Sequence, residues 1–150
     1  MRFMAIQWEG QHIANGPVLP PTTDQITKMV SFHEEQVTAR VLLQAEGLHP
    51  SSKGARVRFS GKKRTVTDGP FTETKELVAG FWIIEAKSME EAIEWVKRIP
   101  NVWQEDTEIE VRQVADAEDV GEAMTPDLEA QIARLHSEAP LGHRQPEHQS

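Results

Sequence analysis

Three ionisable side chains in the sequence have surroundings that could support acid–base chemistry. His33 lies among apolar residues at helical spacing, and a histidine in a cleft between a helix and a sheet can act as a general base or acid. Such a histidine needs a carboxylate to orient it, and Glu46 or Asp68 could supply one. His33, Glu46 and Asp68 are therefore the candidate catalytic residues. His33 also fits a structural role, as a core histidine hydrogen-bonded to a backbone carbonyl.

The two carboxylates also have structural interpretations. Asp68 precedes Gly69 and Pro70, where its side chain can cap a turn by accepting backbone N–H groups. Glu46 interrupts an apolar strand, so it either faces the core with a partner or lies on the surface. The alternative for Asp68 is that its turn presents polar groups to a ligand. The candidate ligand-binding residues are Trp82, Phe71, Thr72 and Glu73.

Several classes of chemistry are absent from the pattern. The chain of 150 residues has no cysteine, which excludes disulfides and thiolate sites and fits a reducing cytoplasm. The other five histidines show no metal-ligand spacing, and no phosphate loop or dinucleotide fingerprint occurs. We therefore expect no metal and no cofactor. A net charge of −8 argues against general nucleic-acid binding, and no run approaches the ~20 apolar residues of a membrane span.

Charge divides the chain into two predicted parts. Residues 1–115 are nearly balanced and form the expected domain, whereas residues 116–150 form an acidic extension. Within it, Thr125 and Pro126 predict the start of a helix over 125–138, followed by a disordered tail. Residues 1–115 include a basic segment without acids, formed by Lys53, Arg56, Arg58, Lys62, Lys63 and Arg64. That segment is either a solvated hairpin or a site for an anionic ligand or for the acidic extension of the same or another copy.

With the hairpin at 55–67 counted as one unit, hydrophobic periodicity predicts the order β-α-β-β-β-α-β, which is close to the ferredoxin-like arrangement. Strands are expected at 2–8, 41–48, 55–59, 64–67, 77–86 and 107–114. The helices are expected to begin after the capping residues Thr22 and Ser88. The first should turn one stripe toward the sheet, formed by Ile26, Met29, Val30, His33 and Val37.

The best strands are apolar on both faces, which predicts a homodimer. Every residue of Phe81-Trp82-Ile83-Ile84 is apolar, and two helices can cover only one face of an antiparallel sheet. A second copy is the economical cover for the other face, since two-fold dimers are the commonest assembly. The C-terminal helix folding back is the rival cover.

The nine residues Asp68 to Glu76, DGPFTETKE, resemble the signature of the YCII-related proteins of the DGPF type. The segments 41–51, 78–85 and 89–100 agree with the same family, so the resemblance covers residues 1–115. It implies a ferredoxin-like α+β fold with an antiparallel sheet, two helices on one face and dimerisation into an α/β barrel. Some relatives on this fold are lyases or dehalogenating enzymes, and DGPF members tend to accompany extracytoplasmic-function sigma factors.

Two departures from the family limit what carries over. The helix-one histidine of the YciI-like branch aligns with Met29 here, so its activity is not transferred to His33. Arg40 stands where many relatives have the glycine that ends this helix.

Two functions follow as hypotheses. The first is a dimeric small-molecule-binding protein or enzyme with a cleft between helix one and the sheet. The second is a non-catalytic regulatory module that binds a protein partner through the hairpin or extension.

Overall fold

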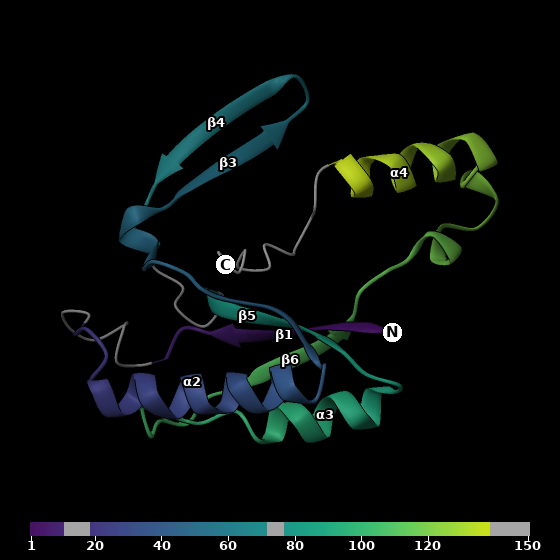
Figure 1. Ribbon diagram of the computed structural model, residues 1–150. Coiled ribbons are helices and arrows are strands. Elements are labelled where there is room, and N and C mark those ends of the chain that lie inside the picture. The colour runs from purple at the N-terminus through teal and green to yellow at the C-terminus, as the bar shows by residue number, and fades with distance from the viewer. Residues whose placement is uncertain (11–18, 72–76, 139–150) are drawn as a thin grey trace, which may run out of the picture.

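The computed structural model describes residues 1–10, 19–71 and 77–138 of the chain (Figure 1). Its main sheet has four antiparallel strands in the order β2-β5-β1-β6, formed by Leu42–Gly47, Val78–Glu85, Arg2–Trp8 and Ile109–Gln113. The helices α2 (Thr23–Thr38) and α3 (Met89–Lys97) lie together on one face of this sheet. This is the predicted ferredoxin-like α+β fold, with antiparallel strands and both helices on one side.

The helix-covered face of the sheet holds the core. Phe3 and Ala5 of β1 pair across the strands with Ile84 and Trp82 of β5, and all four are buried. Ala92 of α3 is fully buried against this cluster. Successive strand side chains point to opposite faces, so the neighbouring residues of the same strands lie on the other side.

The opposite face of the sheet, here called the open face, is also apolar. Met4 pairs with Ile83, and Ile6 pairs with Phe81. These four side chains are only partly buried, whereas their neighbours on the helix side are buried. At the edge strand β6 the open face becomes charged, since Arg112 pairs with Met4 and Glu110 with Ile6.

The capping signals of the sequence place the helix starts correctly. The Thr22 hydroxyl accepts from the Gln25 N–H, and the Gln25 side chain accepts from the Thr22 N–H, so the capping box of α2 is complete. Ser88 caps α3 by accepting from the Glu91 N–H at 3.1 Å, but Glu91 reaches back to the N–H of Lys87 instead. The helix α4 (Pro126–Glu138) begins after Thr125 as expected.

Arg40 ends α2 in a left-handed conformation, with φ of 57°. The N–H of Val41 donates to the Gln36 carbonyl at 2.8 Å, and the N–H of Arg40 donates to the Val37 carbonyl at 3.0 Å. These two bonds form a Schellman motif, which favours glycine at the position of Arg40. The backbone here is therefore the one expected of a glycine, carried by an arginine.

The predicted face of α2 is partly wrong. Phe32 and Gln36 are buried, and Met29 packs on the core, but Val37 is 61% exposed and Ile26 is half exposed. Two overlapping stripes at helical spacing run along this helix. The stripe of Ile26, Val30 and Val37 is exposed, and the stripe that contains Phe32 and the polar Gln36 packs against the sheet. Gln36 is 1% exposed, and its Oε1 has no hydrogen-bond partner among the described residues.

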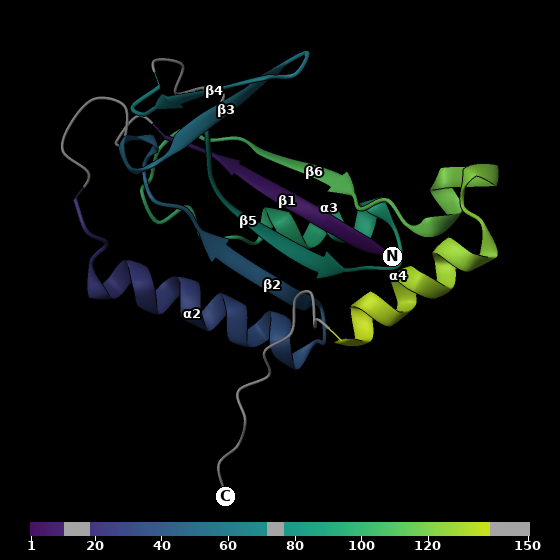
Figure 2. The ribbon, with the colours of Figure 1, turned by 90° about the horizontal axis from the view of Figure 1, so that it is seen from above.

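Two further parts, here called the arms, project from the sheet on the side of the open face (Figure 1). One is the two-stranded hairpin of β3 (Ala55–Ser60) and β4 (Lys63–Asp68), in which every residue is exposed. The other is the extension, with the 3-10 segment η3 (Ala117–Ala123) and α4, neither of which contains a buried residue. Seen from above, the two arms stand at opposite ends of the sheet (Figure 2).

No helix among the described residues is long and apolar enough to cross a membrane.

Candidate functional site

A cavity of about 190 Å³ lies between α2 and the sheet. Met29 and His33 border it from the helix, and Trp82, Ala45 and Gln7 lie on the helix side of the strands that form its floor. Most of this lining is apolar, and its polar residues are His33, Gln7 and Glu46. Such a composition is typical of small-molecule sites, although the volume is below their usual range of about 300–1,000 Å³.

Gly80 lies at the floor of the cavity, where its lack of a side chain lets β2 and β5 approach closely. A Cβ atom at this position would lie 2.8 Å from the carbonyl oxygen of Glu46 on the neighbouring strand β2. Any side chain here would therefore push β2 and β5 apart. Glycine both allows the pairing of these strands and leaves the space above them empty.

His33 is held by the indole of Trp82, whose Nε1–H donates to His33 Nε2 at 3.0 Å. Because an indole N–H is only a donor, His33 Nε2 must be the unprotonated nitrogen and Nδ1 carries the proton. Burial lowers the pKa of His33 below its usual value of 6.5. The structure therefore contains a neutral imidazole with its basic nitrogen already occupied.

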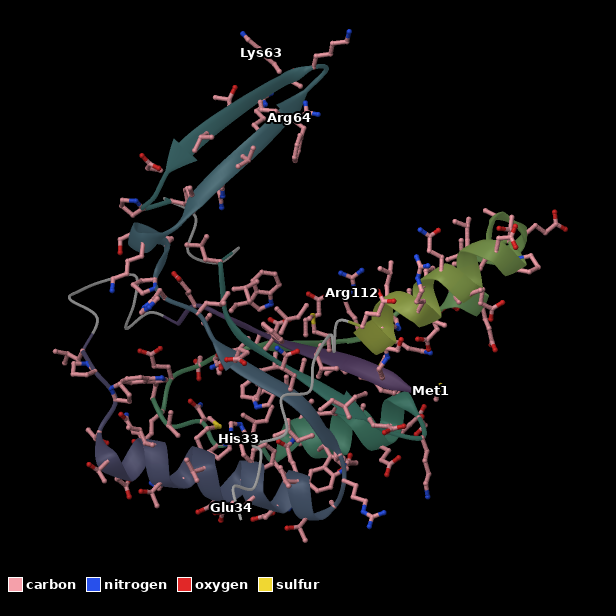
Figure 3. All side chains as sticks on the ribbon, turned by 45° about the horizontal axis from the view of Figure 1, so that its top comes forward. Met1, His33, Glu34, Lys63, Arg64 and Arg112 are labelled. Carbon is pink, nitrogen blue, oxygen red and sulfur yellow. The ribbon has the colours of Figure 1, made fainter. Side chains whose placement is uncertain are left out.

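His33 lies on the side of α2 that faces the sheet, and Glu34 lies on the outer side (Figure 3). The imidazole also borders a shallow groove on the helix surface, next to Val30 and Val37. Among the described residues Nδ1 makes no hydrogen bond. The Nδ1–H is thus the donor that His33 can offer to a bound molecule.

Neither of the two expected carboxylates is the partner of His33. Glu46 pairs across the sheet with Phe81, one position from the pair of Ala45 and Trp82, so its side chain points to the open face and is exposed. Asp68 is exposed at the end of β4, in the hairpin arm. The sequence could not reveal the actual partner, because Trp82 is 49 residues away from His33.

The Asp-Gly-Pro-Phe segment joins the hairpin arm to the sheet. The N–H of Gly69 donates to the Gly54 carbonyl at 2.9 Å, and a Cβ on Gly69 would lie 1.8 Å from the Ser51 carbonyl oxygen. Phe71 donates its N–H to Ser51 Oγ at 3.3 Å. These contacts give the segment a structural role at the base of the hairpin.

The remaining ligand-binding candidates lie at this same base. Phe71 stacks under the Arg56 guanidinium, whose carbon lies 4.0 Å from the ring centroid. Thr72 and Glu73 lie outside the described residues. The structure therefore brings His33 and Trp82 together at the cavity and leaves Asp68 and Phe71 at the hairpin.

The part of the chain that the structure describes contains no group of three or more His, Asp or Glu side chains arranged to hold a metal ion.

Comparison with known proteins agrees with the signature read from the sequence. The chain is 37% identical over 68 residues to an uncharacterized protein of Rhizobium meliloti (strain 1021). That match covers 45% of this chain and 55% of the relative, so it spans about half of each protein. The profile of the YCII-related domain matches residues 1–118, which include the main sheet, α2, α3 and the hairpin. The chain therefore belongs to the YCII-related domain family.

Proposed function

We propose that the protein is a homodimer that binds a small, largely apolar molecule in the cavity between α2 and the sheet. The observation that carries this proposal is the cavity itself, bordered by His33 on the helix and by Trp82 and Gly80 on the sheet. Since liquid water occupies about 30 Å³ per molecule, the cavity has room for a ligand with the volume of about six waters.

The chemistry of His33 favours binding over acid–base catalysis. Its Nε2 accepts from Trp82 and its pKa is lowered, so near neutral pH it is a hydrogen-bond donor through Nδ1 and carries no charge. A suitable ligand is uncharged and apolar over most of its surface, with one acceptor such as a carbonyl oxygen. A catalytic base at this position would first have to give up the indole hydrogen bond.

The open face supports the homodimer. The cross-strand pairs Met4–Ile83 and Ile6–Phe81 leave four large apolar side chains partly exposed, and covering each contributes up to about 1.5–3 kcal/mol. A second copy offers the same self-complementary surface through a two-fold axis.

A thermal-shift screen of uncharged small molecules tests the binding proposal, because a ligand that favours the folded state raises the unfolding temperature. We expect hits with the wild-type protein that are lost in Ala45→Met, which fills the cavity without removing a polar group. His33→Gln keeps an acceptor for the Trp82 indole but replaces the imidazole donor, so it should weaken the hits.

The matched control is His49→Gln, which changes an exposed histidine outside the cavity and should leave every hit unchanged. Hits that persist equally in Ala45→Met would place the ligand elsewhere and contradict the proposal. A screen in which no compound stabilises the wild-type protein would also count against it.

A second candidate, a regulatory module without catalysis, is favoured by the exposed arms. It places a protein partner on the hairpin or the acidic extension, in keeping with the sigma-factor setting that the family resemblance implies. For a partner bound through the extension, a chain ending at residue 115 should still dimerise through the open face but no longer bind that partner. Partner binding by the shortened chain would contradict binding through the extension.

A further inference from the structure

One face of the hairpin arm is largely apolar, and on it the Arg64 guanidinium carbon lies 4.3 Å from the centroid of the Phe59 ring. Val57 and Val66 are directly paired across the strands, and Phe59 lies on the same face, 71% exposed. The other face carries Arg56 and Arg58. A two-stranded hairpin is only marginally stable in water unless another element packs against it. The apolar face of this arm therefore calls for a cover, and no other helix or strand among the described residues provides one.

The extension arm also has an apolar surface that is not buried. The apolar stripe of α4 consists of Leu128, Ile132 and Leu135, and no residue of this helix is buried. Its 13 residues make a helix about 20 Å long, and the six-residue strands of the hairpin are also about 20 Å long. The two uncovered apolar surfaces are thus equal in length.

The arms carry opposite charge. Six bases and no acid lie between residues 53 and 67, and Figure 3 shows Lys63 and Arg64 at the free tip of the hairpin. Residues 116–138 hold seven acids and a single arginine, Arg134. Opposite charges at the rim of an interface select its partner and its orientation.

We propose that in the homodimer the hairpin of each protomer packs against α4 of the other. Both arms stand on the side of the open face and at opposite ends of the sheet (Figures 1 and 2). A two-fold rotation that lays one open face on another brings each hairpin either to the partner's hairpin or to the partner's extension. The first arrangement sets basic against basic, whereas the second sets basic against acidic and covers both apolar stripes.

The occupant of the hairpin face is therefore a second copy of this chain, and each dimer contains two equivalent contacts between unlike arms. This inference rests on the proposed homodimer. It specifies which of the two symmetric arrangements the homodimer adopts. It also gives a role to residues 119–138, which lie beyond the matched family domain.

Engineered cysteines test the arrangement, and no natural cysteine can form a competing disulfide because the chain contains none. Full-length Val66→Cys and Ile132→Cys proteins are made separately, mixed to allow subunit exchange, and exposed to a mild oxidant. We expect a covalent dimer of twice the 16.9 kDa chain mass from the mixture and little from either variant alone. Thr65→Cys lies on the opposite face of the hairpin, so its mixture with Ile132→Cys should not cross-link.

Efficient cross-linking of Val66→Cys alone would mean hairpin against hairpin and would overturn the proposal. A third protein carries both Val66→Cys and Ile132→Cys in one chain. A cross-link within its monomer would mean that α4 folds onto its own hairpin, which also overturns the proposal. Absence of any cross-link overturns it as well. Sedimentation of the wild-type protein distinguishes the two ways in which the proposal can fail. If the protein is a dimer but does not cross-link, only the pairing of unlike arms is contradicted. If it is a monomer, the proposed homodimer is contradicted as well.

Charge reversal gives an independent readout that needs no cysteine. Lys62→Glu with Lys63→Glu should weaken dimerisation about tenfold at low salt, and so should Asp127→Lys with Glu129→Lys. Mixing the two reversed proteins should restore dimerisation as a heterodimer. Loss of dimerisation without restoration, or no change in any of them, would contradict the pairing of unlike arms.

Discussion

Phe3 and Phe59 are the same residue type, each in a strand that pairs with an antiparallel neighbour, yet Phe3 is 1% exposed and Phe59 is 71% exposed. Phe3 lies in the body, where two helices cover the sheet. Phe59 lies in the hairpin arm, which no other helix or strand of the described residues covers. An alternating strand pattern therefore specifies which side chains share a face, and a second layer decides whether that face is buried.

The same difference separates the two faces of the main sheet. The helix side is buried, whereas the open side pairs apolar residues that remain partly exposed. The arms and the open face point in the same direction (Figure 1). We infer that one partner, a second copy, completes all three surfaces together.

Truncating the two phenylalanines should give the largest effect. Phe3→Ala removes a fully buried ring and should cost about 3–5 kcal/mol of unfolding free energy, measured by denaturant titration. Phe59→Ala should lower stability only at protein concentrations where the wild type is a dimer. If Phe59→Ala were as costly as Phe3→Ala in the dilute monomer, the distinction between body and arm would fail.

Gly69 lies where the arm joins the body, and its substitution should give the next largest effect. In Gly69→Ala the new Cβ would meet the Ser51 carbonyl at 1.8 Å, so the backbone must shift, at a cost of about 1–3 kcal/mol. Gly47→Ala is the matched control, because a Cβ there meets nothing within 4 Å. Thermal unfolding of both variants measures the difference, and equal stabilities would contradict a rigid joint.

The pH dependence of stability should report the partial burial of His33. Its pKa is lowered in the folded state, so below about pH 6.5 the unfolded chain takes up a proton that the folded chain does not. This contribution to stability is complete above the unfolded pKa and is lost as pH falls toward the folded value. Unfolding free energies between pH 8 and 5 should fall less steeply in His33→Gln than in the wild type or in the exposed-site variant His49→Gln. Identical slopes would mean that His33 is not held neutral.

Arg40 should give the smallest effect. Arg40→Gly relieves a left-handed conformation and should stabilise the body by about 0.5–1 kcal/mol. Ala39→Gly, one residue earlier in a right-handed conformation, should instead destabilise by a similar amount. A loss of stability in Arg40→Gly would contradict the assigned helix end.

The order of the helices and strands could be predicted because each rests on local signals. Thr22 with Gln25 fixes the start of α2, and the alternation around Val57 and Val66 identifies the hairpin. The packed face of α2 could not be predicted reliably, because Ile26, Val30 and Val37 form a stripe that is more apolar than the one containing Gln36. Only the tertiary packing of α2 against the sheet distinguishes the two stripes.

The candidate site was predictable in its location more than in its chemistry. His33 could be placed on the sheet side of the helix from its spacing, and Trp82 could be expected in the cleft. The hydrogen bond between them depends on the alignment of α2 with β5, which no local pattern specifies. The carboxylates were expected near His33 because their residue types suit catalysis, but strand alternation turns Glu46 away and the hairpin carries Asp68 into the arm.

Sedimentation of the full-length wild-type protein at micromolar concentration, alongside Ile83→Glu, tests whether a second copy of the chain covers the open face. Ile83 lies on the open face and pairs with Met4, so a charge there should prevent the face from being covered while the body still folds. We expect a wild-type species of twice the 16.9 kDa chain mass and a folded monomer for the variant. A wild-type protein that sediments as a stable monomer would contradict it.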